Sequence, residues 1–243
     1  MTRIGTALRL GATELRRTPV LLALLIVGPA YVIYVFTRVA PNGPAIVRVG
    51  GETVRTTLPE AFPAITTPMT AALLAGIAGL FLMQTAATAD ARTVVAGYRA
   101  HQVILARLGL LVGIAGLAAA VSVGVMLTAF QPVQPGWFFV ATTLTALVYG
   151  LAGLLVGVLL DRLVGVYLIL FGSMVDLFIF QNPLATDPPA VAQWLPGHYP
   201  LQLAIRAGFT DKIVLGDLGL TVAYLAVLTV LATAGFYRET KVS

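Results

Sequence analysis

The chain contains no cysteine, only two histidines and few charged side chains. Without cysteine it has no disulfides and no thiolate metal sites, although this absence does not identify the compartment. Only 10% of the 243 residues are charged, against roughly 25% in soluble domains. With 58% hydrophobic residues and a mean hydropathy of +0.93, this scarcity of charge predicts a membrane protein.

The sequence also lacks a GxxxxGK[ST] phosphate loop, and Gly50-Gly51 is followed by no lysine. ATP must therefore be bound by another polypeptide if it is used at all. The net charge of +5 is carried by basic residues at the ends of apolar segments. Basic residues so placed set topology and contact anionic lipid, so we expect membrane lipid, and no nucleic acid, as a partner.

Six apolar segments predict an all-α, polytopic protein with six transmembrane helices in a single transmembrane domain, residues 1–243. They are Thr18–Thr37, Ala64–Ala89, Leu108–Phe130, Trp137–Leu160, Val164–Gln181 and Leu218–Tyr237. The first has 20 residues and spans about 30 Å as a helix, the thickness of the hydrocarbon layer. Gly76 and Gly79 in the second, and Gly153 and Gly157 in the fourth, are expected to permit close helix contact.

Residues 1–17 carry four arginines, with Ile4, Leu8 and Leu15 roughly on one side. This pattern is typical of an amphipathic interfacial helix on the inner leaflet. A cleavable signal peptide is the competing interpretation. It is disfavoured because the apolar segment that follows is long and lacks a clear small-x-small cleavage site.

Two polar stretches interrupt the apolar runs. In the first, residues 38–60, the sequence AIVRVGGETVRT predicts a β-hairpin with Gly50-Gly51 as its turn and Val47 opposite Val54. An unstructured loop is the alternative there. The second stretch, residues 182–217, contains five prolines but is too apolar for a solvated loop. It predicts a pair of short helices, an outer re-entrant segment that dips into the membrane face.

Six spans place both termini on the same side of the membrane. The segments on that side hold ten basic residues: Arg3, Arg9, Arg16, Arg17, Arg92, Arg99, Arg107, Arg162, Arg238 and Lys241. The opposite segments hold five: Arg38, Arg48, Arg55, Arg206 and Lys212. By the positive-inside rule, this predicts a multi-pass protein of the plasma (cytoplasmic) membrane with both termini in the cytoplasm.

The stretch ADARTVVAGYRAHQ, Ala89–Gln102, lies between two uncharged runs, Ala61–Ala89 and Leu108–Leu160. We call residues 90–103 the charged segment. It is expected to form a short cytoplasmic coupling helix lying flat at the membrane surface. An ordinary basic cytoplasmic loop is the alternative.

On a helical wheel, Arg92 and Arg99 share one face of the charged segment, while Val94, Val95 and Tyr98 share another. The basic face would then be free to contact another protein. The hypothesis is that this helix receives mechanical work from a partner ATPase.

The order and spacing of these features resemble the type-2 permease family of ATP-binding-cassette (ABC) exporters over nearly the whole chain. The stretch WLPGHYPLQLAIRAG, Trp194–Gly208, is similar to the Leu-Pro and aromatic-Pro-Leu element common in such permeases. ADARTVVAGYRAHQVILARL resembles the family's acidic-x-basic segment leading into span three, with Asp90 in the acidic position and Arg107 in the basic one. The usual glutamate-rich form of this segment is absent.

The resemblance implies a permease subunit that pairs with a second copy, as a homodimer or heterodimer, and binds an ABC ATPase subunit. ATP and Mg²⁺ would be held by that ATPase subunit, and this chain would be a transport subunit with no cofactor, metal or catalytic residue of its own. The implied coupling residues are Asp90, Arg92, Val94, Val95, Tyr98, Arg99 and His101.

Gln84 and Asp176 are the candidate pathway residues inside the spans. An aspartate at a helix centre costs about 2.5 to 3.5 kcal/mol, so Asp176 requires an explanation. It is either a proton- or substrate-handling carboxylate or, the favoured interpretation, a structural hydrogen-bond partner of a neighbouring helix or of the outer segment. Gln84 either lines a path or bonds to a neighbouring span.

An ion-coupled secondary carrier that uses Asp176 is the alternative function, although the sequence contains no convincing inverted repeat. An intramembrane enzyme is disfavoured because no paired catalytic groups lie in the apolar spans. His101 and His198 fall on opposite sides of the membrane in this topology and cannot share a metal. No HExxH spacing supports an outer metal site around His198.

Overall fold

The computed structural model describes residues 19–95, 100–186 and 189–242. Within these ranges the side chains of residues 19–22, 24, 25, 85–95, 100–103 and 236–242 are not described. The amphipathic helix predicted over residues 1–17 lies outside the described residues.

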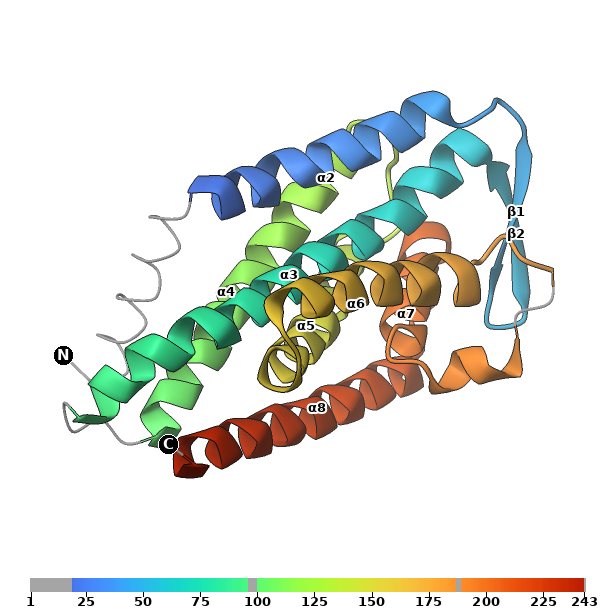
Figure 1. Cartoon of the computed structure of the whole chain (residues 1–243). Helices are drawn as coiled ribbons and strands as arrows, with labels where there is room; N and C mark the ends of the chain where they lie inside the picture. The colour runs from blue at the N-terminus through green and yellow to red at the C-terminus, as the bar shows by residue number, and fades with distance from the viewer. Residues whose placement is uncertain (1–18, 96–99, 187–188, 243) are drawn as a thin grey trace.

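The described chain is a helical bundle with a β-hairpin at one end (Figure 1). In order, its elements are α2 (Pro19–Val39), β1 (Pro44–Val49), β2 (Glu52–Thr57), α3 (Leu58–Val95), α4 (Ala100–Met126), α5 (Pro135–Leu159), α6 (Arg162–Met174), the π-helix η1 (Val175–Phe180), the 3₁₀-helix η2 (Ala190–Trp194), α7 (His198–Phe209) and α8 (Leu215–Val242). The last turns of α3 and α8 lie at the end opposite the hairpin (Figure 1). We call the end that carries β1, β2 and α7 the hairpin end.

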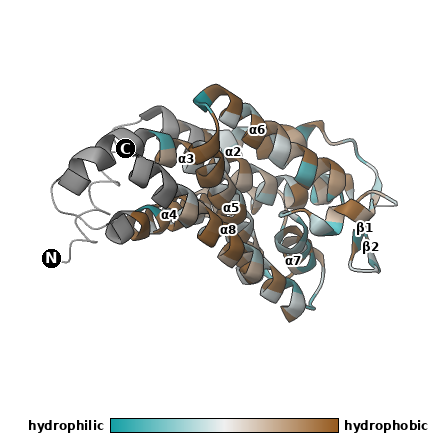
Figure 2. Ribbon diagram, turned by 60° about the horizontal axis from the view of Figure 1, so that its bottom comes forward, coloured by the Kyte–Doolittle hydropathy of each residue, from teal (hydrophilic) through white to brown (hydrophobic). Residues whose placement is uncertain are grey.

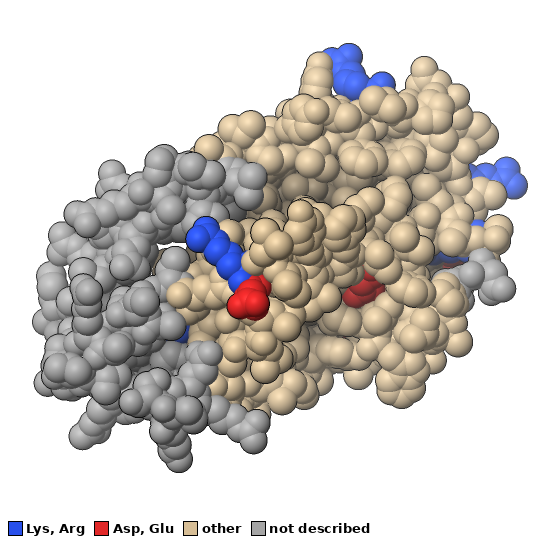
Figure 3. Space-filling model, in the orientation of Figure 1, with Lys and Arg blue, Asp and Glu red and all other residues tan. Residues whose placement is uncertain are grey.

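Five helical segments of the described residues are long and apolar enough to cross a membrane. They are Leu58–Gln84, Ile104–Met126, Pro135–Leu159, Arg162–Phe180 and Leu215–Gly235. Within α2, the stretch Ile26–Val39 is a shorter apolar helix. An all-α polytopic membrane protein is therefore confirmed, while the sixth span stays a prediction. Most of the described helical ribbon is hydrophobic in Figure 2, and many large hydrophobic side chains are exposed. Charged groups are sparse on the described part of the face shown in Figure 3.

Helix α3 is the centre of the bundle and contacts α2, α4, α5 and α6. In its apolar stretch 78% of the residues are buried, against 11% in α8. The predicted glycines explain the closest of these contacts. A Cβ added at Gly79 would overlap the Gly150 carbonyl oxygen, and one added at Gly153 would overlap the Gly76 carbonyl oxygen. Since the backbones of α3 and α5 touch, only glycine fits at these positions.

The hairpin prediction is confirmed over the unstructured-loop alternative. β1 and β2 are antiparallel, with Val47 opposite Val54 as expected. Gly50 and Gly51 form the turn with φ of 52° and 87°, which L-residues with side chains rarely adopt. One face of β1 is buried, so the hairpin is attached to the bundle rather than projecting freely.

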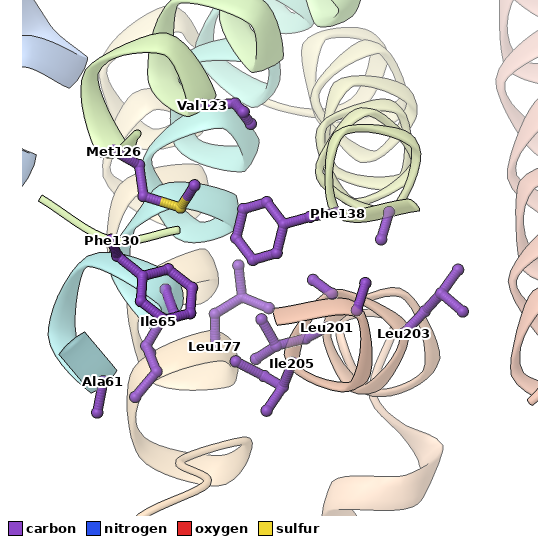
Figure 4. Close-up of a cluster of buried hydrophobic side chains, with 14 of the residues drawn as sticks. Ala61, Ile65, Val123, Met126, Phe130, Phe138, Leu177, Leu201, Leu203 and Ile205 are labelled. Atoms are coloured by element: carbon purple, nitrogen blue, oxygen red, sulfur yellow. The ribbon is translucent and has the colours of Figure 1, made fainter. Parts of the chain in front are cut away.

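The outer segment contains the two short helices that the sequence predicts, η2 and α7, but α7 is not simply a membrane-surface helix. Its apolar positions Leu201 and Ile205 are 1% and 2% exposed and pack against protein. Figure 4 shows them facing Phe138 of α5 and Leu177 of η1. Contact with the bundle core, rather than with lipid, therefore explains the apolar periodicity of this segment.

The charged segment differs from the separate flat helix expected over residues 90–103. The backbone of residues 90–95 continues α3, and residues 100–103 begin α4. No proline follows Pro68 within α3, so nothing interrupts its hydrogen-bond ladder before Val95. The two transmembrane helices thus extend into the segment that was expected to be independent of them.

The contact between α3 and α5 can be tested with Gly153→Ala. Because the new methyl group meets backbone, we expect a loss of about 1 to 3 kcal/mol in the free energy of unfolding, measured by thermal or denaturant unfolding of the detergent-purified protein. Gly116→Ala in α4 is the matched control, since a Cβ there meets open space. Equal stability of the two variants would contradict the close contact.

Candidate functional site

Asp176 lies in η1, at the hairpin end of the fifth apolar segment, and is only 5% exposed. A buried carboxylate is tolerated when hydrogen-bond donors surround it. Three donors do so here. Tyr149 of α5 donates its hydroxyl to Oδ2, the Gly197 backbone N–H donates to Oδ2 over 3.0 Å, and Gln181 Nε2 donates to Oδ1 over 3.1 Å. The carboxylate therefore joins a transmembrane helix to the segment that precedes α7.

The hydrogen bonds continue from Gln181 to His198 at the start of α7. Gln181 Nε2 also donates to the Ala192 carbonyl oxygen over 2.7 Å, so its amide nitrogen faces two acceptors. This arrangement places Gln181 Oε1 toward His198 Nδ1, 2.7 Å away, and an oxygen there requires His198 to donate through Nδ1–H. We call Tyr149, Asp176, Gln181 and His198 the Asp176 network.

The π-helix and a glycine create the space for this network. The Gln181 backbone N–H bonds to the Asp176 carbonyl oxygen, the five-residue spacing of a π-turn, which brings the Gln181 amide beside the Asp176 carboxylate. Gly197 lies directly against it. A Cβ at Gly197 would fall 2.9 Å from both Asp176 Oδ2 and the Tyr149 hydroxyl, and closer still to Leu177. Any larger residue at position 197 would push the outer segment away from the carboxylate.

A cavity of about 470 Å³ lies beside the network, between the hairpin and α7. We call it the hairpin cleft. Its polar or charged lining residues are Arg48, Glu52, Thr53, Gln181, Asn182, His198, Gln202, Arg206 and Asp217. Asp176 does not line it, so the carboxylate reaches the cleft only through Gln181 and His198.

Burial lowers the pKa of His198 from its usual value of 6.5, and the nearby carboxylates of Asp217 and Asp176 only partly oppose this. The folded protein therefore holds His198 neutral at neutral pH. This agrees with the single Nδ1–H donor that the Asp176 network requires.

Gln84 and Arg107 lie at the other end of the bundle. Gln84 Nε2 donates to the Leu160 carbonyl oxygen over 3.1 Å, which is the bond to a neighbouring span that the sequence left open. Gln84 also borders a cavity of about 540 Å³ near Asp161 and Arg162. Arg107 is 9% exposed and donates from Nη1 to Met83 Sδ over 3.2 Å. The structure therefore does not bring Gln84 and Asp176 into one site.

The structure does not test the role of the predicted coupling residues, because it does not describe their side chains. Asp90, Arg92, Val94 and Val95 belong to the last turns of α3 and His101 to the first turn of α4, where side chains are not described. Tyr98 and Arg99 lie outside the described residues. Among the residues that are described, no group of three or more His, Asp or Glu side chains is arranged to hold a metal ion.

Sequence reasoning singled out Asp176 but missed its partners. Tyr149 was one aromatic residue in an uncharged span, and Gly197 was noted only as part of the Pro-rich element. His198 was considered only within that element and as a metal ligand, not as a partner of Asp176. The one usable signal was Gln181, five residues after Asp176 and at the predicted end of its span. Gln181 does not reveal the other partners of Asp176, since Tyr149 and Gly197 are 27 and 21 residues from Asp176 in the sequence.

No protein-family model matches the chain, and no curated protein sequence matches it. The fold and the buried polar network define a polytopic α-helical membrane protein. Any more specific assignment, to a family or to a function, rests on the order of its helices and strands along the chain.

The Asp176 network can be tested with Asp176→Asn. An asparagine presents an NH₂ group to donors that now meet a carboxylate oxygen, so we expect a loss of about 1 to 3 kcal/mol in unfolding free energy. Ser173→Ala is the control one turn earlier, because Ser173 Oγ donates only to carbonyl oxygens of its own helix. A stability for Asp176→Asn equal to that of Ser173→Ala would contradict the assignment.

The lowered pKa of His198 predicts a pH dependence of stability. Between its folded and unfolded pKa values, the unfolded chain binds a proton that the folded protein does not, so stability falls as pH drops below about 6.5. We expect the thermal midpoint to decrease more between pH 7.5 and 5 in the wild type than in His198→Gln, which keeps an N–H donor without the titration. Identical pH profiles would show that His198 does not contribute.

Proposed function

We propose that the chain is the membrane-spanning permease subunit of an ABC transporter of the type-2 exporter kind, powered by ATP hydrolysis on a separate nucleotide-binding subunit. The observation that carries the proposal is the order of elements. A hairpin connects α2 to α3, the charged segment connects α3 to α4, and η2 and α7 connect the fifth apolar segment to α8. This order resembles the layout of such permeases, in which an outer loop follows the first span, a charged segment follows the second and a Pro-rich outer segment precedes the last. On this proposal α2 is the first of six spans, and a second copy completes the transporter.

The helices on both sides of the charged segment support a mechanical role for it. α3 continues for 38 residues to Val95 and α4 begins at Ala100, so a force applied between them acts directly on two transmembrane helices. The glycine contacts then join α3 to α5 without intervening side chains. A displacement at the charged segment would therefore move α3 and α5 together, because close-packed helices do not deform independently.

The surroundings of Asp176 favour this proposal over the secondary carrier. A coupling carboxylate must exchange protons or ions with a pathway, whereas Asp176 is buried among three donors from the protein itself. Its place in the Asp176 network supports a structural role, joining the outer segment to the spans. Transport by the isolated chain that follows a proton gradient and disappears in Asp176→Asn would instead favour the carrier.

The proposed docking can be tested by reversing the charges of Arg92 and Arg99 together. We expect Arg92→Glu/Arg99→Glu to reduce recovery of an ABC ATPase subunit, captured with the tagged full-length chain from its native membranes and identified by mass spectrometry. The physical reason is loss of a basic contact face. Arg38→Glu/Arg55→Glu is the matched control, because it reverses the same charge at the hairpin end.

Two results would contradict the proposal. One is equal ATPase recovery from the wild type, the test variant and the control, which would remove the docking role of the two arginines. The other is full transport by the purified chain with no companion subunit and no nucleotide, which would remove the ABC permease itself.

A further inference from the structure

The hairpin cleft contains one positive charge that no carboxylate among the described residues neutralises. Arg206 Nε lies 3.3 Å from Asp217 Oδ2, and Lys212 Nζ lies 3.3 Å from Glu52 Oε1, so these four charges form two pairs. Arg48 forms no such pair in the described part of the chain. Its guanidinium donates from Nη1 to the Ala185 carbonyl oxygen over 2.8 Å, which fixes the group at the cleft wall.

Further polar atoms of the cleft lack partners. Gln202 Oε1 is buried and accepts no hydrogen bond among the described residues. Although Arg206 Nε and Asp217 Oδ2 are close enough for an ion pair, their geometry is not that of a hydrogen bond. A ligand that combines an anionic group with a hydrogen-bond donor would satisfy both the guanidinium of Arg48 and the oxygen of Gln202.

The size and setting of the cleft are suited to a lipid headgroup. A volume of about 470 Å³ is within the usual range for small-ligand sites, about 300 to 1,000 Å³. Ala192 of η2 lines the cleft, while Val191 and Trp194 of the same short helix are 50% and 73% exposed. Exposed tryptophan is typical of the headgroup level of a membrane. Lys and Arg side chains are visible at this end of the molecule in Figure 3.

We propose that the hairpin cleft binds a phosphate group that carries a neighbouring hydroxyl or ammonium donor, with Arg48 contacting the phosphate oxygens and Gln202 Oε1 accepting from the donor. The phosphate belongs either to the headgroup of a membrane lipid or to a soluble phosphate ester. This site is independent of the ATPase partner, and nothing in it depends on transport.

The experiment measures binding of dioctanoyl phosphatidylglycerol, dioctanoyl phosphatidylcholine and glycerol 3-phosphate to the full-length protein in nonionic detergent, by native mass spectrometry or calorimetry at pH 7.5. His198 is neutral at that pH, so Arg48 is tested alone. Phosphatidylglycerol offers an anionic phosphate and hydroxyl donors, whereas the choline lipid has neither net charge nor donor. We therefore expect the protein to bind phosphatidylglycerol more tightly than phosphatidylcholine. Comparable binding of glycerol 3-phosphate identifies the soluble source.

Two variants remove the charge in different ways. Arg48→Gln deletes it, and Thr53→Glu neutralises it, because Thr53 is exposed and lies directly opposite Arg48 in the hairpin. We expect each to weaken phosphatidylglycerol binding by about tenfold. Arg38→Gln, which removes one charge outside the cleft, should change it by less than about twofold. Thr53→Glu keeps the test decisive even if Arg48→Gln does not fold, since it replaces an exposed side chain.

Three outcomes overturn the site. Unchanged binding in Thr53→Glu shows that Arg48 does not hold the phosphate. Equal weakening in Arg38→Gln shows that only net charge matters.

Asp187 follows the cleft-lining residue Ala185 in the sequence and lies outside the described residues, so binding of phosphatidylglycerol to Asp187→Asn is also measured. If only that variant binds phosphatidylglycerol, the chain's own carboxylate occupies the position assigned to the ligand.

Discussion

The carboxylate of Asp176 requires hydrogen-bond donors wherever it is buried, and this requirement organises the hairpin end of the molecule. One donor is supplied by α5, one by the turn after η1 and one by the backbone before α7. If the outer segment left the bundle, the Gly197 donor would leave too, and a buried negative charge would lose part of its compensation. The segment is therefore attached by electrostatics as well as by the apolar face of α7.

The two ends of the bundle are consequently stabilised by different kinds of interaction. At the hairpin end, a polar network, a β-hairpin and a buried helix form a fixed assembly around the cleft. Toward the opposite end, long helices extend past the apolar stretch into the charged segment, with direct backbone contact between α3 and α5 on the way. Under the proposed function, force would enter at the second end and the network would hold the first.

Much of the fold could be predicted because the relevant signals are local. The apolar runs, the Gly50-Gly51 turn with its flanking alternation, and the spaced glycines each specify structure within a few residues. The limits of this reasoning appear in the charged segment, where charge suggested a separate helix although no residue stops α3 before Val95. They also appear in α7, whose apolar face was assigned to lipid because its protein partners are distant in the sequence.

The sequence by itself determined that this is a polytopic helical membrane protein, where most of its helices lie and how its hairpin pairs, because period and composition act along the chain. The tertiary structure alone decided that Asp176 is satisfied by Tyr149, Gln181 and Gly197. It also decided that the two hairpin strands and α7 line a cleft in which Arg48 forms no ion pair with any described residue. Apart from the Gln181 bond, which spans five residues, these contacts join segments more than 20 residues apart. Hydrogen bonding and close packing between such segments follow from where the helices meet, which no local pattern encodes.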